Sequence, residues 1–329
     1  MKRKNSDKRR NSIWLLILMI VFTGVMLSTS TYAWFTVNRL VQVDSLNVKI
    51  EAQGGIDISV DGTNWKSQVT GEEIQNAGDN YSTHTNQLPE KMEPVSTGGN
   101  VSDGKLDMYL GSVTNNSDGD FVLTSKRDIE VSGNRDGNFI AFDLFIRVNK
   151  DTDLYLTGNS GATYTGDSNP GIENATRFAF LILGNTPSGS SLGVIQSLNG
   201  NDGVYIWEPN YDVHSDSAIS NAASVYNISV NGSGNAPIVY DGVISDILTS
   251  DNVLVGRANS GTYPSLFKGV KVDYYTTSGF NNNVNIFSVK GGITKIRVYI
   301  WVEGQDVDCE NNSSVGNIDF KFEFSSNPS

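Results

Sequence analysis

The sequence predicts an all-β protein: a jelly-roll or Greek-key β-sandwich with long polar loop insertions, preceded by an N-terminal signal peptide or membrane helix. Three observations support this fold class. Short runs of alternating apolar and polar residues recur along the chain, with the period of two that strands require. Asn, Asp, Ser and Gly separate these runs, and Gly alone accounts for 33 of the 329 residues. After the N-terminal segment, no run sustains a helical period.

The first element is an export signal. A basic block precedes an apolar run of 15 residues, Ile13 to Leu27. This run is shorter than the ~20 residues that a spanning helix needs, and it is typical of a secretory signal peptide. Thr31 and Ala33 are small enough for the peptidase pockets that precede a cut, so we expect cleavage between Ala33 and Trp34. The alternative is an uncleaved anchor, with residues 11–35 as a membrane helix.

A linking strand follows the expected cleavage point. Four of its apolar residues share one parity, which places them on one face of a strand, with Arg39 as the exception on that face: Phe35, Val37, Val41 and Val43. The parity changes at Asp44-Ser45, and the alternation continues from Leu46. Such a change predicts a bulge or a separate strand. We therefore expect a signal peptide, a linking strand and a β-sandwich domain, at residues 1–33, 34–45 and 46–329.

The β-sandwich domain contains a series of short alternating runs. The polar stretch 66–104 is expected to be irregular, with one short helix near residues 71–77. In the run 139–148, Asp143 and Arg147 lie opposite the apolar face, so that second face is expected to be at least partly wet. Strands are predicted, in chain order, at residues 56–60, 105–113, 120–126, 128–132, 139–148, 153–157, 177–183, 203–207, 224–230, 237–244, 271–277, 284–290, 293–302 and 317–326.

The cleavage junction resembles that of a known group of exported proteins. The segment Thr31-Tyr32-Ala33-Trp34-Phe35 is similar to the junction of substrates of the SipW-type signal peptidase, although Trp34 is bulkier than the usual residue there. These substrates include the TasA and camelysin-like proteins of Gram-positive bacteria. The run FIAFDLFIRVNKDTDLYL, and the C-terminal succession of WVEG, QDVDCE and a Phe-rich strand, also resemble TasA-like proteins. The resemblance gives no indication of the role of residues 151–292.

The residues needed for catalysis are sparse, and we expect the protein not to be an enzyme. The chain has two histidines, His84 and His214, and neither belongs to an H-E-x-x-H zinc motif. The segment GSSLG matches G-x-S-x-G at Ser191, but Pro187 and the Ser/Gly-rich surroundings indicate a loop instead of a nucleophile elbow. The single cysteine, Cys309, excludes an intramolecular disulfide and is expected to be a small, partly buried apolar residue.

Two acidic loops are the candidates for a cofactor, which would be Ca²⁺. This ion takes six to eight oxygen ligands, and carboxylates supply them well. Neither loop completes the twelve-position calcium-binding pattern, and solvated turn residues are the alternative interpretation. The candidate ligands are Asp118 and Asp120 in NNSDGD, and Asp306, Asp308 and Glu310 in QDVDCEN.

The charge of the chain limits its partners. The net charge is −12, and residues 1–33 are basic, so the remainder of the chain is more acidic still. This acidic remainder lacks the clustered Lys and Arg that contact phosphates, and we expect no nucleic-acid partner. The resemblance implies a structural subunit of an extracellular fibre or biofilm matrix. The expected partners are further copies in a filament, joined by N-terminal strand addition, and the signal peptidase during transient membrane insertion.

A second function from a different class stays open at this stage. An uncleaved N-terminal helix would make the protein an anchored cell-surface binding module, for a carbohydrate or a host ligand. Exposed aromatic side chains would then serve as stacking platforms. The candidates are Tyr205, Trp207 and Trp301. In either case the protein is exported by the Sec route to the cell surface or beyond.

Overall fold

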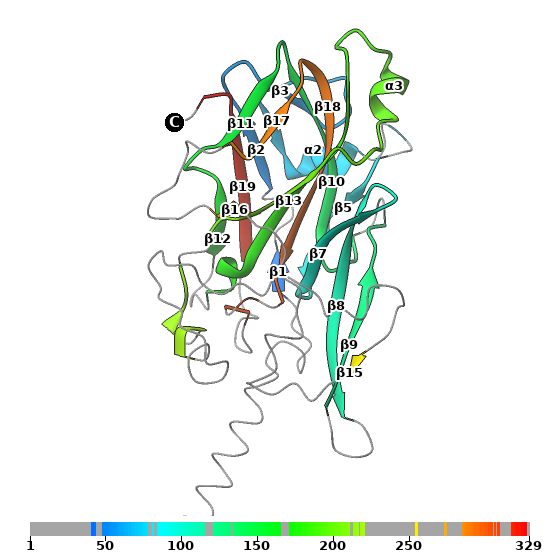
Figure 1. Ribbon diagram of the computed structural model, residues 1–329. Helices are drawn as coiled ribbons and strands as arrows, with labels where there is room; N and C mark the ends of the chain where they lie inside the picture. Colours follow the sequence, from blue (N-terminus) through cyan, green and yellow to red (C-terminus); the bar gives the residue numbers. More distant parts are fainter. Residues whose placement is uncertain are drawn as a thin grey trace, which may run out of the picture.

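The computed structural model is an assembly of β-sheets (Figure 1). It describes residues 41–43, 48–77, 81, 84–115, 121–131, 133, 135–165, 171–210, 213–216, 218–220, 254–255, 273–274, 285–304, 306, 308–309 and 317–327. The expected signal peptide, the cleavage junction, Phe35 and Val37 lie outside the described residues, as do Asp118, Asp120, Glu310 and the predicted strands 224–230 and 237–244. The prediction of an all-β fold is confirmed, because strands dominate the described part of the chain.

A seven-stranded sheet occupies the centre of the molecule. Its three longest strands pair antiparallel. β18 pairs with β10 from Gly292 to Ile300, and with β13 over nearly the full length of β18. In β18 every residue is buried, so both faces of this sheet are covered. The strand order is β16 (Asp273–Tyr274), β14 (Val204–Glu208), β13 (Thr176–Thr186), β18 (Gly292–Val302), β10 (Ile140–Val148) and β3 (Asp57–Ser59), with β5 (Asn86–Gln87) also on β10.

An eight-stranded sheet packs on one face of the central sheet. Its axis is β19 (Asn317–Ser325), which is paired along both sides (Figure 1). β11 (Thr152–Leu156) and β12 (Gly161–Thr165) pair with it antiparallel, whereas β1 (Val41–Val43) and β2 (Lys49–Ala52) pair with it parallel. The remaining members are β17 (Phe287–Val289), β6 (Lys91–Met92) and β4 (Gln68–Thr70).

The main core lies between these two sheets. Alternate residues of β19 are fully buried, namely Ile318, Phe320, Phe322 and Phe324. They meet the apolar face of β13, where Phe178 makes edge-to-face contacts with Phe320 and Phe322 at ring-centroid distances of 6.0 and 6.1 Å. Aromatic pairs in this geometry add to the stabilisation that comes from burial alone.

A four-stranded sheet covers part of the other face of the central sheet. It contains β7 (Val95–Ser102), β8 (Lys105–Asn115), β9 (Phe121–Asp128) and β15 (Leu254–Val255). A second core cluster joins Val95, Leu106 and Met108 of this sheet to Tyr299 and Trp301 of β18. The hairpin of β8 and β9 extends away from the rest of the molecule (Figure 1).

This third layer corrects the prediction of a wet face beside Asp143. Asp143, Lys295 and Arg297 are each at most 3% exposed and form one buried ionic network. The carboxylate of Asp143 accepts from Arg297 Nε at 2.7 Å and contacts Lys295 Nζ at 3.1 Å. Glu130, after β9, accepts from Arg297 Nη1 at 3.3 Å. Glu130, together with Thr85 beside Asp143 and Gln196 beside Lys295, thus replaces water around these charges, while Arg147 stays half-exposed beside Asp57.

The strongest alternating runs form strands, as predicted, but the polar stretch 66–104 is more ordered than expected. The helix α2 (Gly71–Asn76) is present, and Thr70 and Glu73 form its capping box. The same stretch also contains β4, β5, β6 and β7. β7 reads VSTGGNVS, so it forms through pairing with β8 and not through apolar alternation. The predicted strand 128–132 is wrong, because β9 ends at Asp128.

Among the described residues, no helix combines the length and the apolar character that are needed to cross a membrane.

Candidate functional site

The linking strand ends in a slot of the eight-stranded sheet. β1 lies between β19 and β6, with Val43 paired to Ile318 and Val41 paired to Met92. Ile318 and Met92 are both fully buried. β1 and its neighbour β6 are very short, with three and two residues. Few backbone hydrogen bonds therefore hold this end of the linking strand.

β1 and β2 lie one after the other along the same side of β19. Val43 is paired with Ile318, and Lys49 is paired with Lys321. The N-terminal chain thus advances by six residues while β19 advances by three. An odd excess of three residues inverts the alternation of side chains, which accounts for the change of parity after Val43. The two strands are separate, as one of the two sequence-based interpretations expected.

A buried polar cluster forms where the chain leaves the central sheet. Asp306 and Asp308 follow the end of β18, and the backbone N–H of Asp308 donates to the side chain of Asp306 at 2.9 Å. The segment 213–216, which comes after β14, supplies His214. Its Nδ1 lies 2.7 Å from Asp308 Oδ2, and the backbone N–H of Ser215 donates to Asp308 Oδ1 at 2.8 Å.

Arg177 of β13 completes this His214 cluster, which we define as His214, Asp306, Asp308, Arg177 and Glu208. The Nη2 atom of Arg177 lies 2.5 Å from Asp306 Oδ2 and 2.9 Å from Glu208 Oε1. The five side chains are at most 2% exposed. Asp306 and Glu208 thus share one guanidinium, and Asp308 pairs with the imidazole of His214.

Burial and mutual charge shift the proton affinities of the cluster. Burial is the main cause that raises the pKa of Asp308 to about 6, and the charge of Asp306 adds to it. Burial alone would lower the pKa of His214, but its hydrogen bond to Asp308 and the charges of both aspartates outweigh that effect, so the pKa is raised. The charge of Asp306 thus raises the pKa of both groups, whereas burial raises the pKa of Asp308 and opposes the shift of His214.

The arrangement brings together two predicted candidates and one residue that the sequence did not single out. One potential ligand atom from each of His214, Asp306 and Asp308 lies within 4.8 Å of the other two. Asp306 and Asp308 were predicted as calcium ligands, whereas His214 was set aside because it belongs to no H-E-x-x-H motif. The partner of His214 is Asp308, 94 residues away. Only tertiary structure could reveal this pairing.

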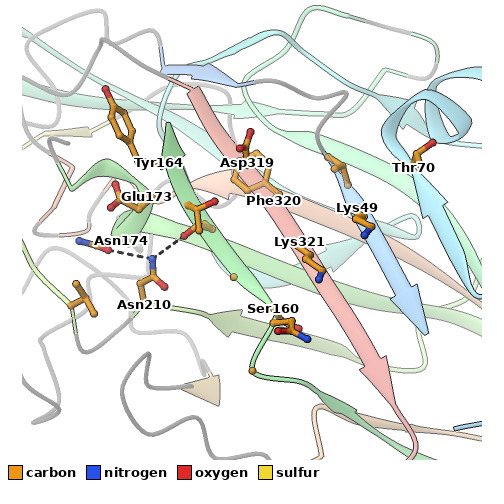
Figure 2. Close-up of a pocket in the computed structure, with 17 residues that line it drawn as sticks. Lys49, Thr70, Ser160, Tyr164, Glu173, Asn174, Asn210, Asp319, Phe320 and Lys321 are labelled. Carbon is orange, nitrogen blue, oxygen red and sulfur yellow. Dashed lines mark hydrogen bonds between the residues drawn. The ribbon is translucent and has the colours of Figure 1, made fainter. Parts of the chain in front are cut away.

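A cleft of about 870 Å³ lies beside the cluster. Figure 2 shows its lining side chains, which come mainly from β12, β19, the loop 158–160 and the 3₁₀ helix η3 (Ile172–Ala175). Asn210 donates to Asn174 Oδ1 at 3.2 Å and to the carbonyl of Ala162 at 3.3 Å across one end of the cleft. Gly171, just before η3, approaches Asp308 so closely that a Cβ there would lie 3.2 Å from Oδ1. η3 therefore lies between the cleft and the His214 cluster.

The proposed aromatic platforms are largely buried. Trp207 is 0% exposed and Trp301 is 1% exposed, so the prediction that they stack on a ligand is wrong. Trp207 faces the main core, and Trp301 lies in the second core cluster. Tyr205 is half-buried, with its ring 5.6 Å from that of Phe287. The cause is again the covering of both faces of the central sheet.

The other three chemical candidates lie at the start of a short helix, in a turn and in the core. Ser191 is exposed at the start of the short helix α3 (Leu192–Gln196), which the sequence did not predict. His84 lies 2.8 Å from the carbonyl of Tyr81 through its Nδ1. Cys309 is buried, in agreement with its interpretation as a small apolar residue.

Comparisons with protein-family models, with curated proteins and with solved structures found no match for this chain. The resemblance to TasA-like proteins accordingly rests on the sequence motifs alone.

Proposed function

We propose that the protein is an exported, non-enzymatic structural subunit of an extracellular fibre or biofilm-matrix-like assembly. Residues 46–329 would be its jelly-roll-type β-sandwich body, and residues 34–45 the strand that joins one subunit to the next. The observation that carries this proposal is the position of β1, a short strand in a slot between β19 and β6. The TasA-like motifs at the junction and near the C-terminus support it.

Polymerisation would proceed by exchange of the linking strand. In a single subunit the slot holds the chain's own β1, and in a filament the same slot would hold β1 of a neighbour. The two arrangements share the same contacts, so the exchange costs little beyond association entropy. Each subunit both gives and receives a strand, which is a head-to-tail contact that does not close and therefore grows into a filament.

Cleavage of the signal peptide would permit this exchange of the linking strand. Before the cut, residues 1–33 hold the linking strand at the membrane. After the cut between Ala33 and Trp34, the strand has a free end, and Phe35 and Val37 extend the apolar stripe of Val41 and Val43. Export by the Sec route and assembly outside the cell would thus be coupled through one peptidase step.

A truncation tests the strand-exchange mechanism. The mature chain starting at Trp34 is compared with a chain starting at Leu46, by electron microscopy, light scattering and circular dichroism. We expect filaments from the first and a folded monomer from the second. Filaments from the shorter chain would refute the mechanism. A substitution pair sharpens the test: Val43→Asp, on the stripe, should block assembly, whereas Gln42→Asp, on the opposite parity, should permit it.

The cleft beside η3 favours a second candidate, the anchored binding module. Its lining includes Lys49, Tyr164, Asn174 and Lys321, which can hydrogen-bond to a polar ligand such as a carbohydrate (Figure 2). N-terminal sequencing of the native protein discriminates the two functions. Released protein with Trp34 as its first residue supports the fibre subunit, whereas cell-bound protein that retains residues 11–35 supports the module.

A further inference from the structure

We propose that Lys295 and Asp143 condense to an intramolecular isopeptide bond, which joins β18 to β10 covalently. The Nζ atom of Lys295 lies 3.1 Å from Asp143 Oδ2, and both side chains are 1% exposed. Asp143 is paired with Arg297, two residues beyond Lys295, so both side chains project from the same face of the central sheet. The inference uses no residue of the linking strand and applies equally to a fibre subunit and to a binding module.

The surroundings of Lys295 favour a neutral, nucleophilic amine. Its Nζ atom lies 5.6 Å from the ring centroid of Tyr81 and 5.8 Å from that of Phe145. Burial lowers the pKa of Lys295 by more than the charge of Asp143 raises it. Burial disfavours both charged forms, whereas an amide carries no charge. The exclusion of water also removes the reactant that would hydrolyse the amide.

Fixed donors around Asp143 activate its carboxyl carbon. Oδ2 accepts from the backbone N–H of Thr85 at 3.2 Å and from Arg297 Nη2 at 3.3 Å, and Oδ1 accepts from Arg297 Nε at 2.7 Å. Attack on Cγ places negative charge on these oxygens, and donors already aimed at them stabilise it. Glu130 lies 3.3 Å from Arg297 Nη1, so Arg297 keeps a counter-ion when Asp143 becomes neutral.

The condensation needs no co-reactant. One proton passes from the ammonium of Lys295 to the carboxylate of Asp143 across their 3.1 Å contact, which gives an amine and a carboxylic acid. The lone pair of Nζ then forms the bond to Cγ. The bond from Cγ to one carboxyl oxygen breaks, and this oxygen leaves as water with the transferred proton and a second proton from Nζ. No group is oxidised or reduced.

The bond would constrain the chain as a disulfide does. It links two central strands that are far apart in sequence, and such a link restricts the unfolded chain. The single cysteine excludes an intramolecular disulfide in this protein. An isopeptide bond would therefore supply a covalent link that this sequence cannot obtain from cysteine.

Mass spectrometry of the purified, folded protein tests the proposal. After denaturation, the intact chain should be lighter by one water than its sequence requires. Trypsin does not cleave after a lysine whose amine is acylated, so the digest should contain residues 136–147 joined to residues 291–297. Fragmentation of this linked peptide should place the bond between Asp143 and Lys295. An intact chain of full mass, or recovery of the two peptides unlinked, would overturn the proposal.

Matched variants separate this bond from other losses of water. Lys295→Arg keeps the positive charge but removes the amine, so this chain should have its full mass. Lys321→Arg is the control, because Lys321 lies 3.0 Å from Glu51 in a partly exposed pair, and it should lose one water like the parent. Succinimide formation at an Asp-Gly pair also removes water, so a loss that persists in Lys295→Arg counts against the bond. If Lys295→Arg does not fold, the linked peptide of the parent chain still decides.

Discussion

Asp61 fixes the turn after β3 through its side chain. Its carboxylate accepts from the backbone N–H groups of Thr63 and Asn64 at 2.7 and 2.8 Å, and from Ser59 Oγ at 2.8 Å. Gly62 takes a φ of +75°, which an L side chain rarely adopts. The dipeptide Asp61-Gly62 marks a turn in the sequence because all these partners are local. Asp308 is the contrary case, because its partner His214 is 94 residues away. Asp308 could be identified in the sequence as a candidate ligand, but the residues around it could not be predicted.

Replacing Asp61 by Ala should lower the free energy of unfolding by about 1–3 kcal/mol, because several donors lose their acceptor. Asp57→Ala on the same hairpin is the control, since its partner Arg147 is half-exposed, and the expected change is under about 1 kcal/mol. Urea denaturation measures both. Equal losses in the two variants would show that the side-chain hydrogen bonds of Asp61 are not the cause.

The same residue predicts an acid-sensitive component of stability. Burial raises the pKa of Asp61, but the hydrogen bonds from Asn64, Thr63 and Ser59 more than offset this, so the pKa is lowered. A lowered pKa in the folded state stabilises the protein above the unfolded value of about 4, and this contribution is lost as the pH falls below it. Between pH 5 and pH 3, the parent chain should therefore lose more stability than Asp61→Asn. Parallel pH profiles would contradict this expectation.

Among the elements, the strands of the central sheet were the easiest to predict from the sequence. The layers that cover these strands were the hardest to predict. Alternation identifies β10 and β18 because one face of each meets the main core. The other face carries Asp143, Arg297 and Tyr299, and polar residues in such positions usually face water. Here Tyr81 and Thr85 contact Asp143. The sheet of β7, β8 and β9 covers Tyr299, and its strand β7 is rich in Gly and Ser and has little apolar alternation. The sequence therefore gives little indication that a strand such as β7 belongs to a layer that covers the central sheet.

The buried network of β10 and β18 should be sensitive to the loss of one member. Asp143→Ala leaves Arg297 and Lys295 without their shared carboxylate in a site that water does not reach. We expect a loss of about 3–5 kcal/mol in the free energy of unfolding. Arg147→Gln, which removes a half-exposed ion pair from the same strand, should cost about 1 kcal/mol or less. A similar small loss for both variants would mean that the network is not desolvated as the structure indicates.

At the scale of the whole molecule, β19 joins the two ends of the chain. The N-terminal strands β1 and β2 pair along one of its sides, and β11 and β12 along the other. These pairings connect residues far apart in sequence, which is typical of slowly folding β proteins. The sheet that contains the linking strand therefore forms only after β19 has been made. This order of folding agrees with the proposed function, in which the subunit stays unassembled until it has left the cell.

Removal of β19 should prevent folding altogether. A chain that ends at residue 316 lacks Phe320, Phe322 and Phe324, all at 0% exposure. Loss of one buried Phe side chain costs about 3–5 kcal/mol. The loss of three such side chains is therefore comparable to the whole free energy of unfolding of a typical domain, which is about 5–15 kcal/mol. We expect this chain to lack a cooperative thermal transition and to be digested rapidly by protease. A chain that lacks only Pro328 and Ser329 should unfold like the parent, since β19 ends at Ser325. Cooperative unfolding of the chain without β19 would show that the central sheet and its covering layer fold independently, and that the eight-stranded sheet is an addition to them.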